Sequence, residues 1–252
     1  MDRMQALDQV IWLSHEIGLE ERQMVILGEG NTSANIGDGT FWVKASGHSL
    51  PTIGADGFSR VSIDKILSYL DGEALDEHGV ADALKTSKVS TEFPKPSVET
   101  FLHALCMKEC GANFIAHTHA VSVNQLLCSK LGAEPFMGNI CPDQIVVCGA
   151  APAVVPYIDP GFHLSVAVRN EFRRYMDTYG KPPKVLLMVN HGIVALGKTA
   201  KEAFNIQLMA DKWAKILVGA LSSGGINYMD EENVKKISNR LDEKYRAALL
   251  EK

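Results

Sequence analysis

Short apolar segments rich in β-branched residues alternate with longer segments of helical spacing along this chain of 252 residues. Residues 185–189 and 193–196 are two such short segments, and residues 200–221, which follow them, have the apolar spacing of a helix. Alternation of this kind predicts strands that are covered by helices. We therefore expect an α/β fold with three layers, in which a mixed β-sheet is flanked by helices.

The remaining elements follow from the same two patterns. Clusters of β-branched and aromatic residues between turns predict further strands at residues 25–27, 41–44, 61–63, 113–118 and 145–148. Helical spacing predicts helices up to residue 18 and at residues 97–110, 121–131, 164–179 and 231–249. Ser97 is the expected N-cap of the second of these helices, and Thr199 with Glu202 has the spacing of a capping box at residue 200.

No repeat and no long Pro, Gly or Ser-rich linker divides the sequence. A chain of this length is compatible with one large core. We therefore expect residues 1–252 to form a single domain.

Charge and composition exclude several classes of partner. The net charge is −5 and Lys and Arg form no run, which argues against nucleic acids and against membrane surfaces. The longest apolar runs are far shorter than the ~20 residues of a membrane span, and the first residues lack the pattern of a signal peptide. Five cysteines without C-x-x-C spacing indicate free thiols. We expect a cytoplasmic protein that acts on a small molecule.

Three histidines are candidate metal ligands. His117 and His119 lie at the end of a predicted strand, where alternate side chains point to the same side, so both can bind one ion. His191 follows another predicted strand and precedes Gly192. Three imidazoles that leave coordination positions open are typical of catalytic zinc. Hydrogen-bonded strand histidines and a solvated turn histidine are the alternative interpretations.

Glu99 is the candidate acid and base. It lies in the first turn of the helix that we expect to begin at Ser97, beside the apolar residues Val98 and Phe101. A carboxylate in such surroundings can exchange protons with a substrate. The alternative interpretation is a favourable contact with the helix dipole.

Two turns and one helix start are candidate anion sites. Asn31 lies in a Gly-rich turn, Ser46 and Gly47 form a second turn, and Ser97 is expected at a helix N-terminus. Strand alternation places the ammonium of Lys44 on the same side as Ser46. These turns lack the order of a P-loop and the dinucleotide fingerprint, which disfavours nucleotide binding. Each could also be an ordinary turn or cap.

These features occur together in one order along the chain. The order is Gly30-Asn31-x-Ser33, Ser46-Gly47, Pro96-Ser97-x-Glu99, His117-x-His119 and Asn190-His191-Gly192. The ordered set resembles the class II aldolase/adducin family. The resemblance implies a homotetramer in which His117, His119 and His191 hold zinc or another divalent ion and Glu99 transfers a proton. It also implies that Asn31, Ser46, Gly47 and Ser97 bind the anionic end of a sugar phosphate. Lys44 is added to this set because strand alternation places it beside Ser46.

Finer motifs look most like the aldolase half of the bifunctional rhamnulose-phosphate aldolase/lactaldehyde dehydrogenases, and we expect no dehydrogenase half. The implied reaction is cleavage of a ketose 1-phosphate to dihydroxyacetone phosphate and an aldehyde through a metal-stabilised enediolate. A sugar-phosphate epimerase, a dehydratase and a 3-oxo sugar acid decarboxylase are alternatives at the same site. An adducin-like binding or assembly module is the alternative that is not an enzyme.

Overall fold

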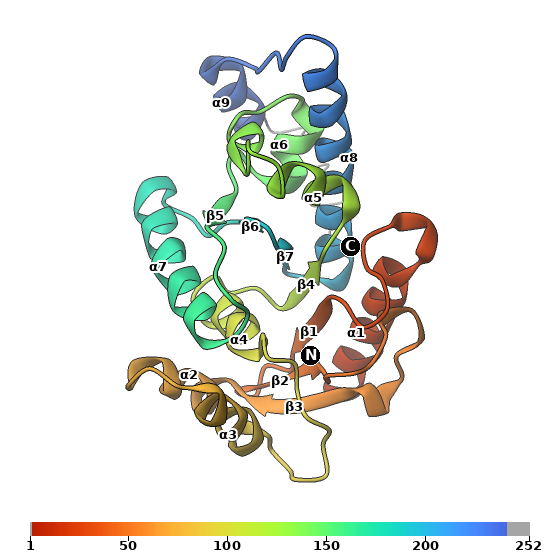
Figure 1. The fold of residues 1–252 in the computed structure, drawn as a ribbon, viewed down its shortest axis with the longest axis vertical. Helices are drawn as coiled ribbons and strands as arrows, with labels where there is room; N and C mark the ends of the chain where they lie inside the picture. Colours follow the sequence, from red (N-terminus) through yellow and green to blue (C-terminus); the bar gives the residue numbers. More distant parts are fainter. Residues whose placement is uncertain (1, 241–252) are drawn as a thin grey trace.

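The computed structural model describes residues 2–240, and seven strands in this part of the chain form one sheet (Figure 1). The strands are β1 (Asn31–Asn35), β2 (Thr40–Lys44), β3 (Phe58–Ser62), β4 (Phe114–Thr118), β5 (Ala153–Val155), β6 (Val185–Met188) and β7 (Gly192–Gly197). Their order across the sheet is β3-β2-β1-β4-β7-β6-β5. Neighbouring strands are antiparallel except for the parallel pair of β5 and β6. The expected mixed sheet is confirmed.

Helices cover both faces of this sheet. They are α1 (Arg3–Gly18), α2 (Ile63–Ser68), α3 (Glu77–Ser87), α4 (Thr100–Lys108), α5 (Val121–Leu127), α6 (Pro142–Cys148), α7 (Phe162–Tyr179), α8 (Ala200–Ser222) and α9 (Glu231–Asn239). Short 3₁₀ turns occur at Glu20–Arg22, Leu50–Thr52, Ala55–Gly57, Tyr69–Asp71 and Glu134–Met137. In Figure 1, α4 and α7 lie on one side of the strands, and α1 and α8 lie on the other.

Side-chain alternation divides the core between the two faces. Phe114 and Ala116 of β4 pack in a cluster with α1, α5 and α8, whereas Ile115 packs in a second cluster with α2, α3, α4 and α7. Successive strand residues point to opposite faces, so a strand that is buried on both sides contributes to both clusters. This arrangement confirms the three-layer α/β fold.

Two predicted strands are wrong. Residues 25–27 lie in a loop that turns at residues 27–28, in which Ile26 is 65% exposed and Leu27 is 82% exposed with a φ of 55°. Residues 145–148 belong to α6, whose first residue is Pro142. Proline lacks an N–H group and has a fixed φ, which favours it at the first position of a helix. These two segments are apolar, but neither lies in the sheet.

Several boundaries also differ from the prediction. The helix expected to begin at Ser97 begins at Thr100. The cap at Thr199 is confirmed, because its side chain accepts a hydrogen bond from the backbone N–H of Glu202. Helix α9 confirms the first part of the last predicted helix, and residues 241–249 lie outside the described residues.

Within residues 2–240, none of the helices combines the length and the apolar character that crossing a bilayer takes.

Candidate functional site

The three predicted histidines lie together at one end of β4 and β7. His117 is in β4, His119 follows its last residue, and His191 precedes β7. The centres of the three rings lie 4.9, 4.9 and 5.1 Å apart, and one ring nitrogen from each ring lies within 4.8 Å of the others. Residues that are 72 positions apart in the sequence therefore converge because β4 and β7 are paired antiparallel.

One hydrogen bond fixes the ring of His117. Its Nδ1 atom lies 3.0 Å from the carbonyl oxygen of Ile193. A carbonyl oxygen only accepts, so Nδ1 carries the proton and Nε2 keeps a free electron pair. This Nε2 atom lies 3.0 Å from Nε2 of His119. Two nitrogens that share a tetrahedral ion with ordinary zinc bonds are about 3.4 Å apart, so the spacing is close to that of a shared ion.

His117 and His191 are held in the form that binds metals. Burial, followed by the effect of the neighbouring His119, lowers the pKa of His117 to about 3. Burial and His117 lower the pKa of His191 to about 4. Both rings are therefore neutral near pH 7, and a neutral imidazole is the species that donates an electron pair to a metal ion.

The turn that carries His191 is tightly constrained. Asn190 has a φ of 56°, in the left-handed region that few residues other than glycine adopt. At Gly192, an added Cβ would lie 2.3 Å from the carbonyl oxygen of Thr118, so only glycine fits beside β4. Asn124 donates a side-chain hydrogen bond of 3.0 Å to the carbonyl oxygen of His191. Sequence analysis missed Asn124, because nothing in its helix marks it as a partner of a distant turn.

Glu99 lies immediately before α4 and faces the histidines. Its Oε1 atom is 3.3 Å from Nε2 of His191, and its Oε2 atom is 3.4 Å from Nε2 of His117. The carboxylate is buried, and Asn31 donates a hydrogen bond of 2.6 Å to Oε2. The predicted acid is therefore placed next to the predicted metal ligands.

The candidate anion-binding residues meet where the end of β2 pairs with the segment before Glu99. An isolated bridge joins Ala45 to Pro96, and the N–H of Ser97 donates to the carbonyl oxygen of Lys44 at 3.0 Å. The hydroxyl of Ser46 donates to the carbonyl oxygen of Pro96 at 3.2 Å. This pairing across 50 residues places Lys44, Ser46 and Ser97 side by side.

Lys44 carries the positive charge of this region. Its side chain is buried, and its Nζ atom donates a hydrogen bond of 3.0 Å to the carbonyl oxygen of Gly28. Burial lowers the pKa of Lys44, and the nearby carboxylate of Glu99 partly offsets that effect. A buried ammonium close to open space is well placed to bind an anion.

A cavity of about 270 Å³ joins these groups. Eight of the nine predicted site residues line it. The ninth, His117, does not line the cavity but contacts Glu99, which does. The eight are Asn31, Lys44, Ser46, Gly47, Ser97, Glu99, His119 and His191. The structure thus brings together residues from five separate parts of the sequence.

Glu29 also lines this cavity, and sequence analysis missed it. Its Oε1 atom lies 3.7 Å from Nδ1 of His119, and its Oε2 atom accepts a hydrogen bond from the N–H of Ile26. The sequence did contain a signal for this role. Glu29 is an acidic residue in the Gly-rich turn that we expected to bind an anion, and an acid there indicates a different partner, such as a histidine.

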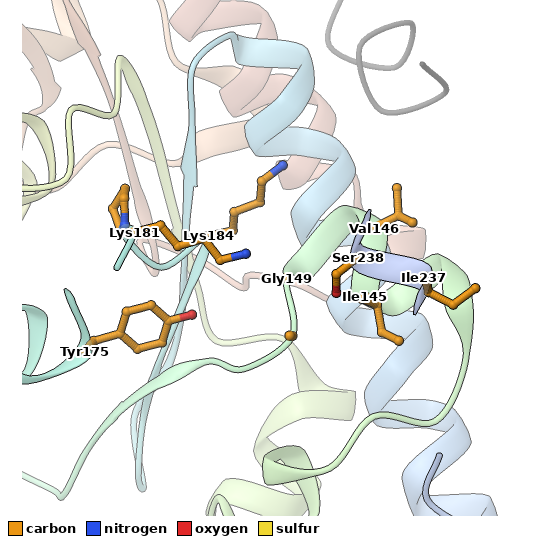
Figure 2. A pocket seen from close by; sticks show the side chains of 10 residues that line it. Ile145, Val146, Gly149, Tyr175, Lys181, Lys184, Ile237 and Ser238 are labelled. Atoms are coloured by element: carbon orange, nitrogen blue, oxygen red, sulfur yellow. The ribbon is translucent and has the colours of Figure 1, made fainter. Parts of the chain in front are cut away.

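Another hollow lies away from this site, between α6, α9 and the segment that follows α7 (Figure 2). It has a volume of about 160 Å³ and is lined by Tyr175, Lys181 and Lys184 among others. The hydroxyl of Tyr175 donates to the carbonyl oxygen of Ala151, and burial raises its pKa to about 12. None of the predicted site residues lines this hollow.

The donor set fits a divalent ion. In addition to the three ring nitrogens, Oε1 of Glu99 and Nδ1 of His191 are buried and have no hydrogen-bond partner among the described residues. Buried polar atoms are rarely left without a partner in a folded protein. Three imidazoles with an adjacent carboxylate form the kind of ligand set that catalytic zinc uses.

Burial of histidine gives a prediction for stability. Burial lowers the pKa of His103 to about 3, and an unfolded histidine titrates near ~6.5. Between these values only the unfolded chain binds the proton, so the free energy of unfolding falls as the pH drops from ~6.5 towards 3. At pH 5 we expect a loss of about 2 kcal/mol from this imidazole.

Urea unfolding at pH 7 and pH 5 checks this prediction. The loss of stability in His103→Gln is expected to be smaller than that of the unmodified protein by about 2 kcal/mol. Equal losses in both proteins would show that His103 is not held neutral by the fold.

The fold and the site define an α/β protein with a three-histidine site that could bind a divalent metal ion. The chain belongs to the family described as Class II Aldolase and Adducin N-terminal domain, whose model matches residues 9–218. Members of this family include aldolases, dehydratases and decarboxylases of sugar phosphates and related compounds. The family predicted from the ordered motifs is therefore confirmed.

Individual relatives cover different shares of the chain. The uncharacterized oxidoreductase YuxG of Bacillus subtilis is 27% identical over 209 residues, which is 79% of this chain but only 27% of that protein. The 3-oxo-tetronate 4-phosphate decarboxylase of Haemophilus influenzae is 27% identical over 87% of this chain and 90% of its own length. The N-terminal class II aldolase domain of a conserved protein from Thermoplasma acidophilum has a TM-score of 0.67 and 27% identity, and the match covers 84% of this chain and 93% of that structure.

Proposed function

We propose that this chain is a metal-dependent aldolase that cleaves a ketose 1-phosphate to dihydroxyacetone phosphate and an aldehyde. The observation that carries the proposal is the position of Glu99. Its two oxygens lie 3.3 and 3.4 Å from nitrogens of His191 and His117, in contact with a cavity that also contains the ammonium of Lys44. A metal site, a proton-transfer group and an anion site are therefore within the reach of one small substrate.

His117, His119 and His191 are the proposed ligands of the ion, which we propose to be zinc. A divalent ion held there would supply a Lewis acid that stabilises negative charge on the oxygens of the substrate. The low pKa values of His117 and His191 keep both rings neutral and available as ligands at the pH of the cell.

Glu99 is the proposed proton-transfer residue. In the cleavage direction the bond between two carbons of the ketose breaks, and its electron pair remains on the carbon next to the carbonyl group. Glu99 in its acid form gives that carbon a proton. The hydroxyl group on the carbon that leaves releases its proton to water and becomes the carbonyl group of the aldehyde, and the carboxylate of Glu99 takes a proton back from water. In the synthesis direction the carboxylate removes the same proton.

The phosphate end of the substrate is the proposed partner of Lys44, Ser46, Gly47 and Ser97. A phosphate there would accept hydrogen bonds from the hydroxyl groups and from the ammonium, which provides charge-assisted hydrogen bonds. Asn31 lies between this group and Glu99. Holding the phosphate fixes the distance from the reacting carbon to the carboxylate, and this orientation lowers the barrier of the reaction.

Decarboxylation is the second candidate function. It is favoured by the decarboxylase relative from Haemophilus influenzae, because that match covers 90% of the relative's length. Loss of carbon dioxide from a 3-oxo sugar acid also leaves an electron pair on the carbon next to a carbonyl group, so the same residues could serve it. Epimerisation and dehydration would use the same metal and acid.

Product identification distinguishes these reactions. The zinc-loaded protein should be incubated with a panel of ketose 1-phosphates and 3-oxo sugar acid phosphates. Dihydroxyacetone phosphate with one equivalent of aldehyde is the expected result. Release of carbon dioxide from the sugar acids, without aldol cleavage, would show that the protein is a decarboxylase and not an aldolase. A protein that purifies without a stoichiometric divalent ion and converts no substrate would instead support a binding or assembly module.

We also propose that the protein acts as a cytoplasmic homotetramer made of single-domain subunits. The support is the family to which the chain belongs. Light scattering of the purified protein tests the number of subunits.

A further inference from the structure

Four buried polar side chains form a chain of hydrogen bonds that ends at the carboxylate of Glu99. The hydroxyl of Ser33 lies 2.6 Å from Nδ1 of His103, and Nε2 of His103 is hydrogen-bonded to Oδ1 of Asn31. Asn31 in turn donates from Nδ2 to Oε2 of Glu99 at 2.6 Å. Ser33 and Asn31 belong to β1, and His103 is in α4.

The charge of Glu99 sets the direction of every bond in this chain. An ionised carboxylate only accepts, so Asn31 must present its amide nitrogen to Glu99 and its oxygen to His103. The ring of His103 must then donate from Nε2, which leaves Nδ1 to accept the proton of the Ser33 hydroxyl. The neutral state of the ring is consistent with this direction, because burial lowers the pKa of His103 to about 3.

The two oxygens of Glu99 have different surroundings. Oε2 accepts the hydrogen bond from Asn31, whereas Oε1 is buried without a hydrogen-bond partner among the described residues. The hydrogen bond from Asn31 therefore fixes one side of the carboxylate. Oε1, which is 3.3 Å from Nε2 of His191, is turned towards the three histidines.

We propose that His103 is a positioning residue, which acts through Asn31 to hold the carboxylate of Glu99 by Oε2 and keeps Oε1 directed towards His191. This inference rests on the proton-transfer role proposed for Glu99. Asn31 has two partners in this arrangement. Its amide nitrogen, which donates to Glu99, also lies 3.3 Å from the hydroxyl oxygen of Ser97 among the candidate anion-binding residues. Asn31 thus connects the group that holds the substrate with the group that reacts.

Steady-state kinetics test this role. His103→Leu removes the donor to Asn31, so kcat is expected to fall by about 10–100-fold while KM changes by less than about threefold. His103→Gln keeps an N–H donor near the position of Nε2, so it is expected to recover most of kcat. Ser33→Ala removes only the partner of Nδ1 and is expected to lower kcat by about fivefold. Cys106→Ala is the matched control, since this buried residue of α4 takes no part in the hydrogen bonds that connect Ser33 with Glu99.

A spectroscopic measurement tests the same proposal without turnover. Nitrogen NMR of the zinc-loaded protein, with label only in histidine, reports which ring nitrogen carries the proton, and the signal missing from His103→Gln identifies His103. We expect the proton on Nε2. A proton on Nδ1 would overturn the proposal, and so would His103→Leu with kcat within twofold of the unmodified protein or with loss of bound zinc. If no tested substrate reacts, the proposed function fails. The position of the ring proton would still show whether the hydrogen bonds from Ser33 through His103 and Asn31 are all donated in the direction of Glu99.

Discussion

Glu99→Gln is expected to lower kcat by about 10²–10⁴-fold while the protein still binds one divalent ion per chain. The amide keeps the size of the side chain and can still accept a hydrogen bond from Asn31, which donates to Oε2 in the unmodified protein. It cannot take up and return a proton. The expected loss is therefore in the chemical step, and substrate binding should change little.

Two measurements on the same protein make this result decisive. Metal analysis shows whether the three histidines still bind the ion, and KM shows whether the anion site still holds the substrate. A matched control is Glu29→Gln, which changes the other carboxylate that lines the cavity, 3.7 Å from His119. Unchanged turnover in Glu99→Gln would remove Glu99 from the mechanism, and a loss of similar size in both variants would show that the lost negative charge is responsible.

His119→Ala is expected to abolish metal binding at the concentrations used in assays. Loss of one of three imidazoles should weaken the affinity for the ion by at least ~100-fold, since even the outer partners of metal ligands contribute 10–100-fold. Turnover should fall with the metal content. His119 is the best choice of the three, because it is partly exposed and lies beyond the end of β4, so its removal disturbs the core least.

Metal analysis after gel filtration, together with activity assays in added zinc, checks this prediction. Treatment of the unmodified protein with a chelator should give the same loss, and added zinc should reverse it only in that protein. His78→Ala, which changes an exposed histidine of α3, is expected to keep both metal and activity. Full metal content in His119→Ala would place the ion elsewhere.

The sequence predicted the sheet best where strands are apolar on both faces. β6 and β7 are buried along their whole length, so their β-branched and aliphatic residues are a direct signal. β1 was missed because its sequence, Asn-Thr-Ser-Ala-Asn, has little strand preference. It lies between β2 and β4 nonetheless, because its polar side chains find buried partners: Thr32 bonds to Ser14, and Ser33 bonds to His103.

The site shows the same division between local and long-range information. Local patterns identified the histidines, Glu99 and the hydroxyl residues, since each belongs to a short motif. Their juxtaposition depends on pairing between strands, and the register of β1 with β4 sets Asn31 directly opposite His117. At Gly30 an added Cβ would lie 2.7 Å from the carbonyl oxygen of His117, so the glycine of the motif permits this approach. Partners such as Asn124 have no local pattern and could not be predicted.

The polar character of β1 has a consequence for protein engineering. Residues 31–33 look like weak points in the middle of the sheet, and a design procedure that maximises thermal tolerance would replace them with valine or isoleucine. Such replacements would remove the groups that align Glu99 and would leave Ser14 and His103 without their buried partners, so turnover is expected to fall without the intended gain in stability. Libraries built to improve robustness in this chain should therefore leave this strand unchanged and introduce diversity at the outer helices.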